Sequence, residues 1–367
     1  MDQEKVAAMP IILSACMMVK NEQELLPQCL ASIVDVVDEI VVVDTGSDDL
    51  TPDIALAMGA KVYHHPWQED FSLHRNQAFG YSTGDWCLVI DADEELARLA
   101  VPREELMRRF SMIPANIGGL VASIHEFDQR TRQIEYAWLS TRVFRRSMNP
   151  RYEGYVHNTN RFDGDAAMTD FLINHYGYHL SPEKMAKKFE RTGGMLRKKL
   201  QEDPNDYKAM YYLVQNLSAQ DKWEEAARIG EVCMSLIPVT ADKLQFYGNL
   251  YFIIGWCWLR QKDGNRAMAW TKKGIELFPE DLDLNWLMTQ ICYHAGMDGE
   301  FEKYAAKYTE LLPIFRDSLA GKRRNGSFSS AIDLPESIKQ NRTVTTVATR
   351  YAVIVAKQLQ ELQGVKG

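Results

Sequence analysis

The sequence predicts an α/β domain followed by an all-α domain that is built from repeats. In the first half, short apolar runs of strand length alternate with helix-length segments. In the second half, helical segments recur and prolines follow them at similar intervals. A chain of 367 residues is long enough for two domains that each bury a core.

Four strands alternate with three helices in the predicted α/β domain. Each strand is a run of mostly apolar residues, and each helix carries apolar residues three and four positions apart. The predicted strands are 11–19, 39–43, 61–65 and 86–90, and the predicted helices are 24–33, 51–58 and 71–81. Strands and helices that alternate at this spacing are typical of a parallel sheet covered by helices.

Polar clusters directly follow three of these strands. They are Lys20-Asn21-Glu22, Asp44-Thr45-Gly46-Ser47 and Asp91-Ala92-Asp93-Glu94. Each cluster alone is typical of an ordinary turn. Because ligands of parallel α/β sheets bind at the carboxyl ends of the strands, the three together predict one site.

The pair Asp91 and Asp93 gives this site its predicted chemistry. Two carboxylates placed two residues apart project to the same side if the chain stays extended. Mg²⁺ and Mn²⁺ prefer oxygen ligands and commonly hold a substrate diphosphate as well. No G-x-G-x-x-G follows the first strand and the chain has no G-x-x-x-x-G-K-[ST], which argues against dinucleotide binding and a P-loop hydrolase.

Composition excludes several other classes. The net charge of −8 gives no reason to expect binding of nucleic acid. The six cysteines are scattered, which favours reduced core thiols. No segment reaches the roughly 18 apolar residues of a membrane helix, and the N-terminus lacks the basic start of a signal peptide. We therefore expect a cytoplasmic protein without a transmembrane segment.

Several motifs occur along the first half of the chain. They are Met18–Glu22, Val42–Ser47 with Asp49 and Thr51, Pro66–Ser72 with Arg75-Asn76, Gly84-Asp85-Trp86 and Asp91–Glu94. Together they resemble the motifs of family 2 glycosyltransferases with the GT-A fold, in the order found in that family. The resemblance covers about residues 10–180 and is strongest to the branch that carries tetratricopeptide repeats after the catalytic domain. Some members of that branch glycosylate peptides, including the cysteine of bacteriocin precursors.

The resemblance implies a bacterial enzyme that uses a nucleotide-sugar, and a UDP-sugar is expected. It implies that Asp93 binds Mn²⁺ or Mg²⁺ and that Asp91 lies near the ribose and the metal ion. Asp44 would face the nucleobase, with a turn or helix-cap role as the alternative. Arg75 would pair with a phosphate or with the acidic cluster. The other nucleotide-sugar-binding positions are Val19, Asn21, Glu22, Ser47 and Ala92.

A third metal ligand is expected at His157. Its segment Tyr152–His157 resembles the family's aromatic-x-Gly-x-(Val/Ile)-His motif, and a neutral imidazole nitrogen can ligate a metal ion. His175 and His179 are alternatives. Many relatives have a glutamate directly after the metal-side histidine, whereas this chain has Asn158.

The general base of an inverting transfer stays open at this stage. Such a base must lie near the acceptor nucleophile. Glu126 and Asp128 are ranked ahead of Glu153. A thiol acceptor would need less assistance because cysteine ionises near neutral pH.

The second half predicts a short solenoid of tetratricopeptide units of about 34 residues, closed by Pro238, Pro279 and Pro313. We expect a mobile loop at 316–330 and, over 343–362, a helix that caps the array or pairs two chains as a homodimer. The predicted organisation is a GT-A domain at 1–180, a connecting helix at 181–203, repeats at 204–313, and the loop and C-terminal helix at 314–367.

The leading hypothesis is a metal-dependent glycosyltransferase whose acceptor is a peptide or protein presented by the repeats. A second hypothesis is a transferase that acts on a saccharide or a lipid-linked acceptor in surface polysaccharide synthesis. A third, of another class, is a protein-binding scaffold with an inactive transferase domain. Asn158 favours this last alternative.

Overall fold

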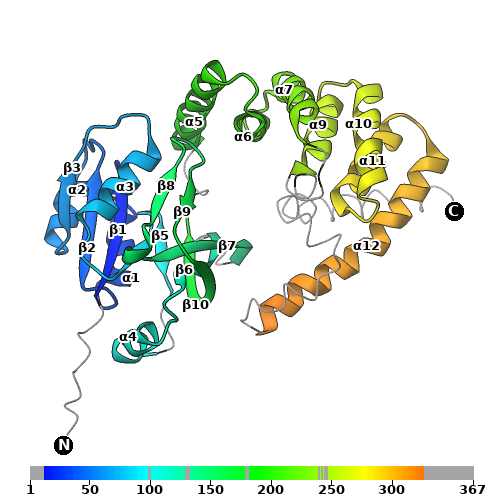
Figure 1. Ribbon diagram of the computed structural model, residues 1–367. Coiled ribbons are helices and arrows are strands. Elements are labelled where there is room, and N and C mark those ends of the chain that lie inside the picture. Colours follow the sequence, from blue (N-terminus) through cyan, green and yellow to red (C-terminus); the bar gives the residue numbers. More distant parts are fainter. Residues whose placement is uncertain are drawn as a thin grey trace, which may run out of the picture. The chain divides into compact units, whose positions relative to one another are not determined.

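The chain divides into two compact units, Met1–Pro182 and Glu183–Gly367 (Figure 1). The structure is a computed structural model and describes residues 12–97, 101–128, 133–177, 182–238, 240, 243 and 247–325. None of the helices in these ranges has the length and apolarity needed to cross a membrane. The helix predicted over 343–362 lies outside the described residues.

An eight-stranded sheet forms the centre of the first unit, in the order β3-β2-β1-β4-β7-β6-β10-β5. The first four of these strands are parallel, as the sequence predicts. The rest of the sheet was not predicted, and it is mixed, since β7 runs antiparallel to both β4 and β6. The strands are β1 (Leu13–Val19), β2 (Glu39–Asp44), β3 (Lys61–His64), β4 (Trp86–Val89), β5 (Glu94–Leu96), β6 (Ile117–Asp128), β7 (Gln133–Arg145) and β10 (Asp165–His175), with β8 (Arg151–Glu153) and β9 (Thr159–Arg161) in a separate pair.

Helices cover the sheet on both faces because successive strand residues point to opposite sides. Met17 and Val42 face a core that includes residues of α1, α2 and α4. Cys16 and Val41 face a second core that includes residues of α3. The helices are α1 (Leu26–Ile33), α2 (Thr51–Ala57), α3 (Phe71–Tyr81), α4 (Arg103–Ser111) and the short 3₁₀ turn η1 (Arg146–Met148).

The second unit is helical in all its described elements, and three of its helix pairs share one turn geometry. The residue two before the second helix of each pair has a left-handed backbone: Asp221 has φ 59°, Lys262 has φ 62° and Gly296 has φ 66°. The same turn recurring along the chain supports the predicted repeat. The helices are α5 (Pro182–Glu202), α6 (Tyr207–Ser218), α7 (Trp223–Leu236), α9 (Leu250–Arg260), α10 (Gly264–Leu277), α11 (Leu282–His294) and α12 (Asp298–Asn325).

Two predictions about the end of the array are wrong. Pro238 and Pro279 follow the ends of α7 and α10, but Pro313 lies inside α12 and closes nothing. The predicted loop at 316–330 is helical as far as Asn325. A proline inside a helix removes one hydrogen bond and crowds the carbonyl group four residues before it. The residues after Pro313 are mostly good helix formers, and the helix continues through them.

Candidate active site

The first two polar clusters meet at the carboxyl edge of the sheet. Val19 and Asp44 stand opposite each other in the β1–β2 register, so both loops leave the sheet at the same level. The backbone N–H of Asn21 donates to Ser47 Oγ over 2.9 Å, and the N–H of Thr45 donates to the carbonyl oxygen of Val19 over 2.9 Å. Asn21 has φ 57°, a left-handed conformation that asparagine tolerates well.

Glu22 ties this edge to two helices. Its backbone N–H donates to Thr51 Oγ1 over 2.7 Å, at the start of α2. Its carbonyl oxygen accepts from the N–H of Leu26, the first residue of α1. The backbone around Glu22 is therefore fixed by the two elements that flank it.

Asp44 occupies a turn. Its side chain is only 3% exposed, and its carboxylate accepts hydrogen bonds from the backbone N–H groups of Gly46 and Ser47 at 3.2 Å. His64 Nδ1 lies 3.2 Å from the same carboxylate. This is the turn role that the sequence leaves open beside contact with a nucleobase.

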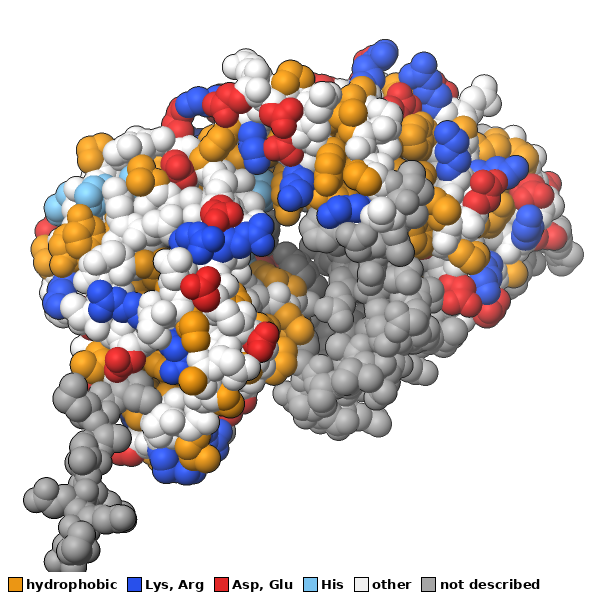
Figure 2. Space-filling view, viewed as in Figure 1, with side chains coloured by type: hydrophobic (Ala, Val, Ile, Leu, Met, Phe, Trp, Pro, Cys, Tyr) orange, Lys and Arg blue, Asp and Glu red, His pale blue; other side chains and the backbone are white. Residues whose placement is uncertain are grey.

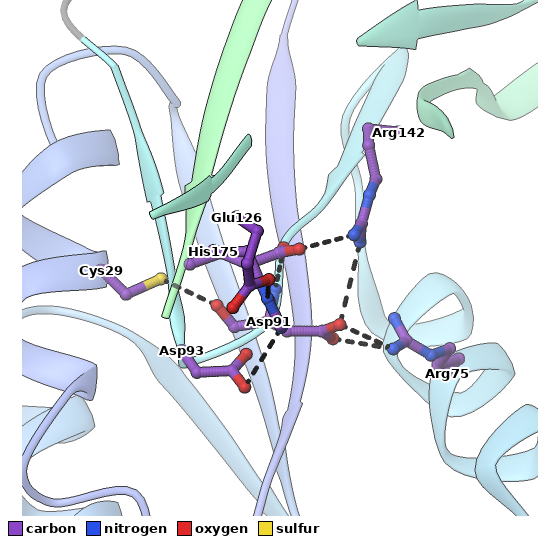
Figure 3. Close-up of polar contacts among 8 residues, drawn as sticks. Cys29, Arg75, Asp91, Asp93, Glu126, Arg142 and His175 are labelled. Atoms are coloured by element: carbon purple, nitrogen blue, oxygen red, sulfur yellow. Dashed lines mark hydrogen bonds and ion pairs between the residues drawn. The ribbon is translucent and has the colours of Figure 1, made fainter. Parts of the chain in front are cut away.

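Asp91 lies in a buried ionic network (Figure 3). Arg75 Nη2 donates to both oxygens of its carboxylate, over 2.8 and 3.0 Å, and Arg142 Nη1 lies 3.8 Å away. Burial alone would raise the pKa of Asp91, but the charges of the two arginines outweigh it and lower that pKa to about 2. Asp91 is therefore ionised, and its pairing with Arg75 is the acidic-cluster role predicted for that arginine.

Arg142 is a member of this network that the sequence did not identify as a site residue. It lies on β7, and its Nη2 donates to Glu94 Oε1 over 2.5 Å. The other oxygen of Glu94 accepts from the backbone N–H of Asp91 over 2.8 Å. Burial raises the pKa of Glu94 to about 7 although Arg142 opposes this. An arginine between apolar residues on a long strand, Thr141-Arg142-Val143-Phe144, is the sequence feature that could have indicated it.

Asp93 belongs to a second chain of polar contacts, which runs through His175. Nε2 of His175 lies 3.5 Å from Asp93 Oδ2, and Nδ1 lies 2.6 Å from Glu126 Oε2. Burial alone would lower the pKa of His175, but the two carboxylates outweigh it and raise that pKa to about 10. In Figure 3 the two arginines lie on one side of Asp91, and Asp93 and His175 lie on the other.

Three neighbours restrict the geometry of Asp93 and His175. The indole of Trp138 meets the His175 ring edge to face, with ring centroids 5.9 Å apart. The backbone of Gly177 passes so close that a Cβ there would lie 2.2 Å from Asp93 Oδ2. Tyr176 donates its backbone N–H to the carbonyl oxygen of Asp93 over 2.9 Å. The segment after β10 therefore packs directly on Asp93.

Helix α3 presents Arg75 through contacts with β8 and the residues that follow it. Asn76 exchanges two hydrogen bonds with the backbone of Tyr152, at 2.8 and 2.9 Å, and Ser72 Oγ donates to the carbonyl oxygen of Gly154 over 2.6 Å. The guanidinium of Arg75 also lies 5.2 Å from the centroid of the Tyr152 ring. These contacts explain why the motif around Arg75 and the one around Tyr152 occur in the same sequence.

The three base candidates have different surroundings. Glu126 is fully buried, so it would act on a substrate only through His175. Glu153 is half exposed on β8 and pairs with Arg151 at 3.0 Å and Arg161 at 3.4 Å. Asp128 ends β6, and its side chain lies outside the described residues.

The histidines predicted as possible metal ligands lie in different places. His157, with φ 47°, lies between β8 and β9, whereas His175 lies beside Asp93. His179 lies outside the described residues. Ala92, between the two aspartates, is 4% exposed and packs in the core.

Asp93 is the candidate ligand for a divalent cation at this edge. Within the described ranges, no group of three or more histidine, cysteine, aspartate or glutamate side chains could hold a metal ion by itself. The side chain of Asp93 is 22% exposed and is the carboxylate best placed to accept one, because Asp91 is engaged by Arg75. One carboxylate plus phosphate oxygens and water is a usual environment for Mg²⁺ or Mn²⁺.

The first unit is similar in sequence to known glycosyltransferases. The family model described as Glycosyl transferase family 2 matches residues 14–169. A TPR repeat-containing protein of Synechococcus elongatus is 38% identical over 204 residues, which cover 53% of this chain and 49% of that protein. The SPbeta prophage-derived glycosyltransferase SunS of Bacillus subtilis is 26% identical over 221 residues, which cover 57% of this chain and 50% of that protein.

The chain therefore spans about half the length of these curated relatives. Among solved structures, S. aureus TarS in complex with UDP-GlcNAc aligns with a TM-score of 0.41 and 15% sequence identity. That alignment covers 70% of this chain and 90% of the TarS chain.

Proposed function

Because residues 14–169 form a family 2 glycosyltransferase domain, we propose that the protein transfers a sugar from a UDP-linked donor to a peptide or protein acceptor, with inversion and with Mn²⁺ or Mg²⁺. One observation carries the proposal. At the carboxyl edge of β1, β2 and β4, the carboxylates of Asp91 and Asp93 are both partly exposed, and Asp91 is ionised beside Arg75 and Arg142.

Departure of a nucleoside diphosphate requires neutralisation of charge on two phosphates. A metal ion held by Asp93 and the diphosphate would supply Lewis-acid stabilisation of that leaving group. His175 is the nearest nitrogen to Asp93 and is the alternative to His157 as a further ligand. It must lose its proton to serve in that way, so metal affinity should rise with pH.

Arg75 and Arg142 set the electrostatics on the other side of the site. Arg142 is buried, the side chain of Arg75 is 16% exposed, and both contact Asp91, so they hold its carboxylate in one orientation. Arg142 also holds Glu94, whose second oxygen fixes the backbone N–H of Asp91. These residues would position the Asp91–Asp93 segment for the ribose and the diphosphate rather than react themselves.

A peptide or protein acceptor is supported by the helical repeats of the second unit, since arrays of this kind commonly present a concave binding surface. Glu126 could assist deprotonation of the acceptor near Asp93 only through His175, which would first have to lose its own proton and would then not serve as a metal ligand. Asn158, where many relatives have glutamate, favours the alternative in which the repeats bind a partner and the transferase domain is inactive.

Donor binding and turnover of the purified full chain test this proposal. We expect UDP to bind by calorimetry with Mn²⁺ and to lose binding with EDTA, and one sugar in a panel of UDP-, GDP- and dTDP-sugars to be released. Asp93→Ala should lower turnover at least about 10³-fold. Glu224→Ala, an exposed carboxylate change on α7, is the control and should leave turnover unchanged.

Two results would contradict the proposal. Absence of metal-dependent UDP binding together with no turnover of any donor in the panel would favour the scaffold alternative. Full turnover by Asp93→Ala would show that Asp93 is not needed for the reaction.

A further inference from the structure

The helical unit contains a cavity of about 660 Å³ beside α9 and α11. This volume is within the usual range of sites that bind small molecules or peptide side chains. Trp256, from α9, contributes apolar surface, and the buried Trp286 of α11 packs against it with ring centroids 5.6 Å apart. Gln290 and Ile291, on the next turn of α11, add one polar and one apolar side chain. The cavity is thus apolar with few polar groups.

Every charged residue that lines this cavity is basic. Arg260 ends α9, Lys262 lies in the turn to α10, and His294, the titratable member, ends α11. None of the ten described lining residues is an aspartate or glutamate. The cavity therefore presents positive potential beside aromatic surface.

Two basic residues at the cavity have no carboxylate partner in the described part of the chain. Both Arg260 and Lys262 are exposed, and neither forms an ion pair there. Lys272 and Lys273 on α10 are likewise without an ion pair among the described residues, whereas several other basic side chains of the unit are paired with carboxylates of the chain. Those pairs are Arg197–Glu225, Lys199–Asp206, Arg228–Glu224, Arg266–Asp263, Lys303–Glu300 and Lys307–Glu310.

Aromatic contacts hold Arg260 without neutralising it. Its guanidinium carbon lies 5.4 Å from the centroid of the Trp223 ring and 5.6 Å from that of Trp256. Stacking of this kind orients a guanidinium and leaves its N–H groups able to bind a carboxylate. Because the Arg260 side chain is already ordered before a ligand binds, it loses less conformational entropy on binding.

We propose that this cavity docks an acidic segment of a peptide, with an apolar side chain packed against Trp256 and Leu259 and carboxylates on Arg260 and Lys262. The argument for this occupant is charge complementarity together with the aromatic lining. A single-stranded nucleic acid has similar chemistry, but a net charge of −8 disfavours binding of a polyanion. The docking of a peptide here does not depend on the proposed function. The further claim that this peptide is the acceptor of sugar transfer does rest on it.

Fluorescence anisotropy with the full chain tests the docking. The probes are a pool of fluorescein-labelled decapeptides in which two glutamates flank a leucine or phenylalanine, and a matched pool with glutamine in place of glutamate. We expect the acidic pool to bind at least about tenfold more tightly than its matched pool, and less tightly at 0.5 M NaCl.

Two variants that each remove one positive charge show whether the acidic peptide binds at the cavity or to positive surface charge in general. Arg260→Gln should weaken binding of the acidic pool about tenfold or more. Lys272→Gln, an exposed change on α10 away from the cavity lining, should leave it unchanged. Equal binding of the two pools, equal effects of the two variants, or tighter binding of a labelled dT10 oligonucleotide would each overturn the inference.

UDP binding by the same wild-type preparation distinguishes the two proposals. Loss of peptide docking with metal-dependent UDP binding intact overturns the docking inference alone. Peptide docking without any UDP binding or donor turnover supports the docking and overturns the transferase.

Discussion

The ionic network at the candidate site of the α/β unit and the ion pair on α7 of the helical unit differ in exposure. In the α/β unit, Asp91, Glu94 and Arg142 form a network in which the Arg142 side chain is 11% exposed and that of Glu94 is 1% exposed. In the helical unit, the pair Arg228–Glu224 is 61% and 56% exposed. Charged side chains of both signs are scattered over the visible surface of both units (Figure 2).

This difference shows where charge has a use beyond solubility. Burying an ion pair is expensive and often no more stabilising than apolar packing. An exposed pair contributes little and is screened by salt. A buried network at a strand edge is therefore better explained by a binding site than by stability. The predictions that follow test this distinction, from the largest expected effect to the smallest.

Removal of Asp91 should have the largest effect on stability. Asp91→Ala leaves Arg75 and Arg142 buried with less compensating charge, so we expect a loss of about 3–5 kcal/mol in the free energy of unfolding of the α/β unit. Urea unfolding measures it, with the buried thiols Cys87 and Cys292 labelled to report on each unit separately.

A double-mutant cycle with Arg75→Met is the control for this prediction. The cycle should give a coupling energy above about 1 kcal/mol because the two side chains are in direct contact. A cost below about 1 kcal/mol for Asp91→Ala would mean that the network is effectively solvated and that the contrast between the two units is wrong.

Gly177→Ala should disturb the site more than the fold. The new Cβ would lie 2.2 Å from Asp93 Oδ2 and 2.7 Å from His175 Nε2, so both groups must shift. A displacement of about 1 Å commonly lowers turnover about 100-fold. We expect that loss in donor turnover with a urea midpoint near wild type. Gly264→Ala, at the open start of α10, is the matched control. Wild-type turnover by Gly177→Ala would exclude Asp93 from the reaction.

Acid should destabilise the α/β unit through Glu39. Burial would raise the pKa of Glu39, but hydrogen bonds from Lys61, Ser14 and Thr83 outweigh it and lower that pKa from 4.5 to about 2. The stabilisation is therefore present above about pH 4.5 and is lost as pH falls toward 2. Because Lys61 is 58% exposed, solvent screening limits the effect to about 2 kcal/mol.

Glu39→Gln is the variant that checks this prediction. It should lose that stability at pH 7 and show a flatter dependence on pH below 4.5. Urea midpoints measured between pH 2.5 and pH 7, with Cys87 as the reporting thiol, supply the comparison. A wild-type profile in the variant would assign the acid sensitivity of this unit to other groups.

The helical unit should respond to acid in the opposite direction through Asp281. Burial raises the pKa of Asp281 to about 6, and only backbone N–H groups oppose it. The folded state therefore holds the proton more tightly than the unfolded state, so stability falls as pH rises from about 4 to about 6.

Asp281→Asn keeps the N-cap hydrogen bond to Leu284 and removes the charge. We expect about 1 kcal/mol more stability at pH 7 and no dependence on pH between 4 and 6, with Cys292 as the reporting thiol. If Asp281→Asn is less stable than wild type at both pH 4 and pH 7, the buried charge of Asp281 does not lower the free energy of unfolding.

The sequence predicted best the part of the site that lies at the ends of regular strands. Four strands and three helices occur where apolar periodicity places them, and Asn21 and Ser47 do meet across the sheet edge. These features follow from local pattern and from the rule that parallel strands share a carboxyl edge. A single sequence is sufficient for both.

The rest of the site depends on contacts between distant segments. Arg142 reaches Asp91 from β7, and His175 reaches Asp93 from β10, over 51 and 82 positions of sequence. No periodicity encodes such pairings, because they follow from the antiparallel placement of β7 beside β4 and of β10 beside β5. At Pro313 the local rule that a proline marks the end of a helix gave a wrong prediction, because α12 continues through it.

The smallest effect should come from the exposed pair on α7. Glu224 and Arg228 are one turn apart at 2.8 Å, and both are more than half exposed. Glu224→Ala should change the free energy of unfolding of the helical unit by no more than about 0.5 kcal/mol, and high salt should reduce the difference further. Urea unfolding at 0.05 and 1 M NaCl, with Arg228→Ala as its counterpart, measures it. A loss above about 1.5 kcal/mol would mean that this exposed pair stabilises its unit about as much as the buried network stabilises the other. Exposure would then not predict how much an ion pair contributes to the free energy of unfolding.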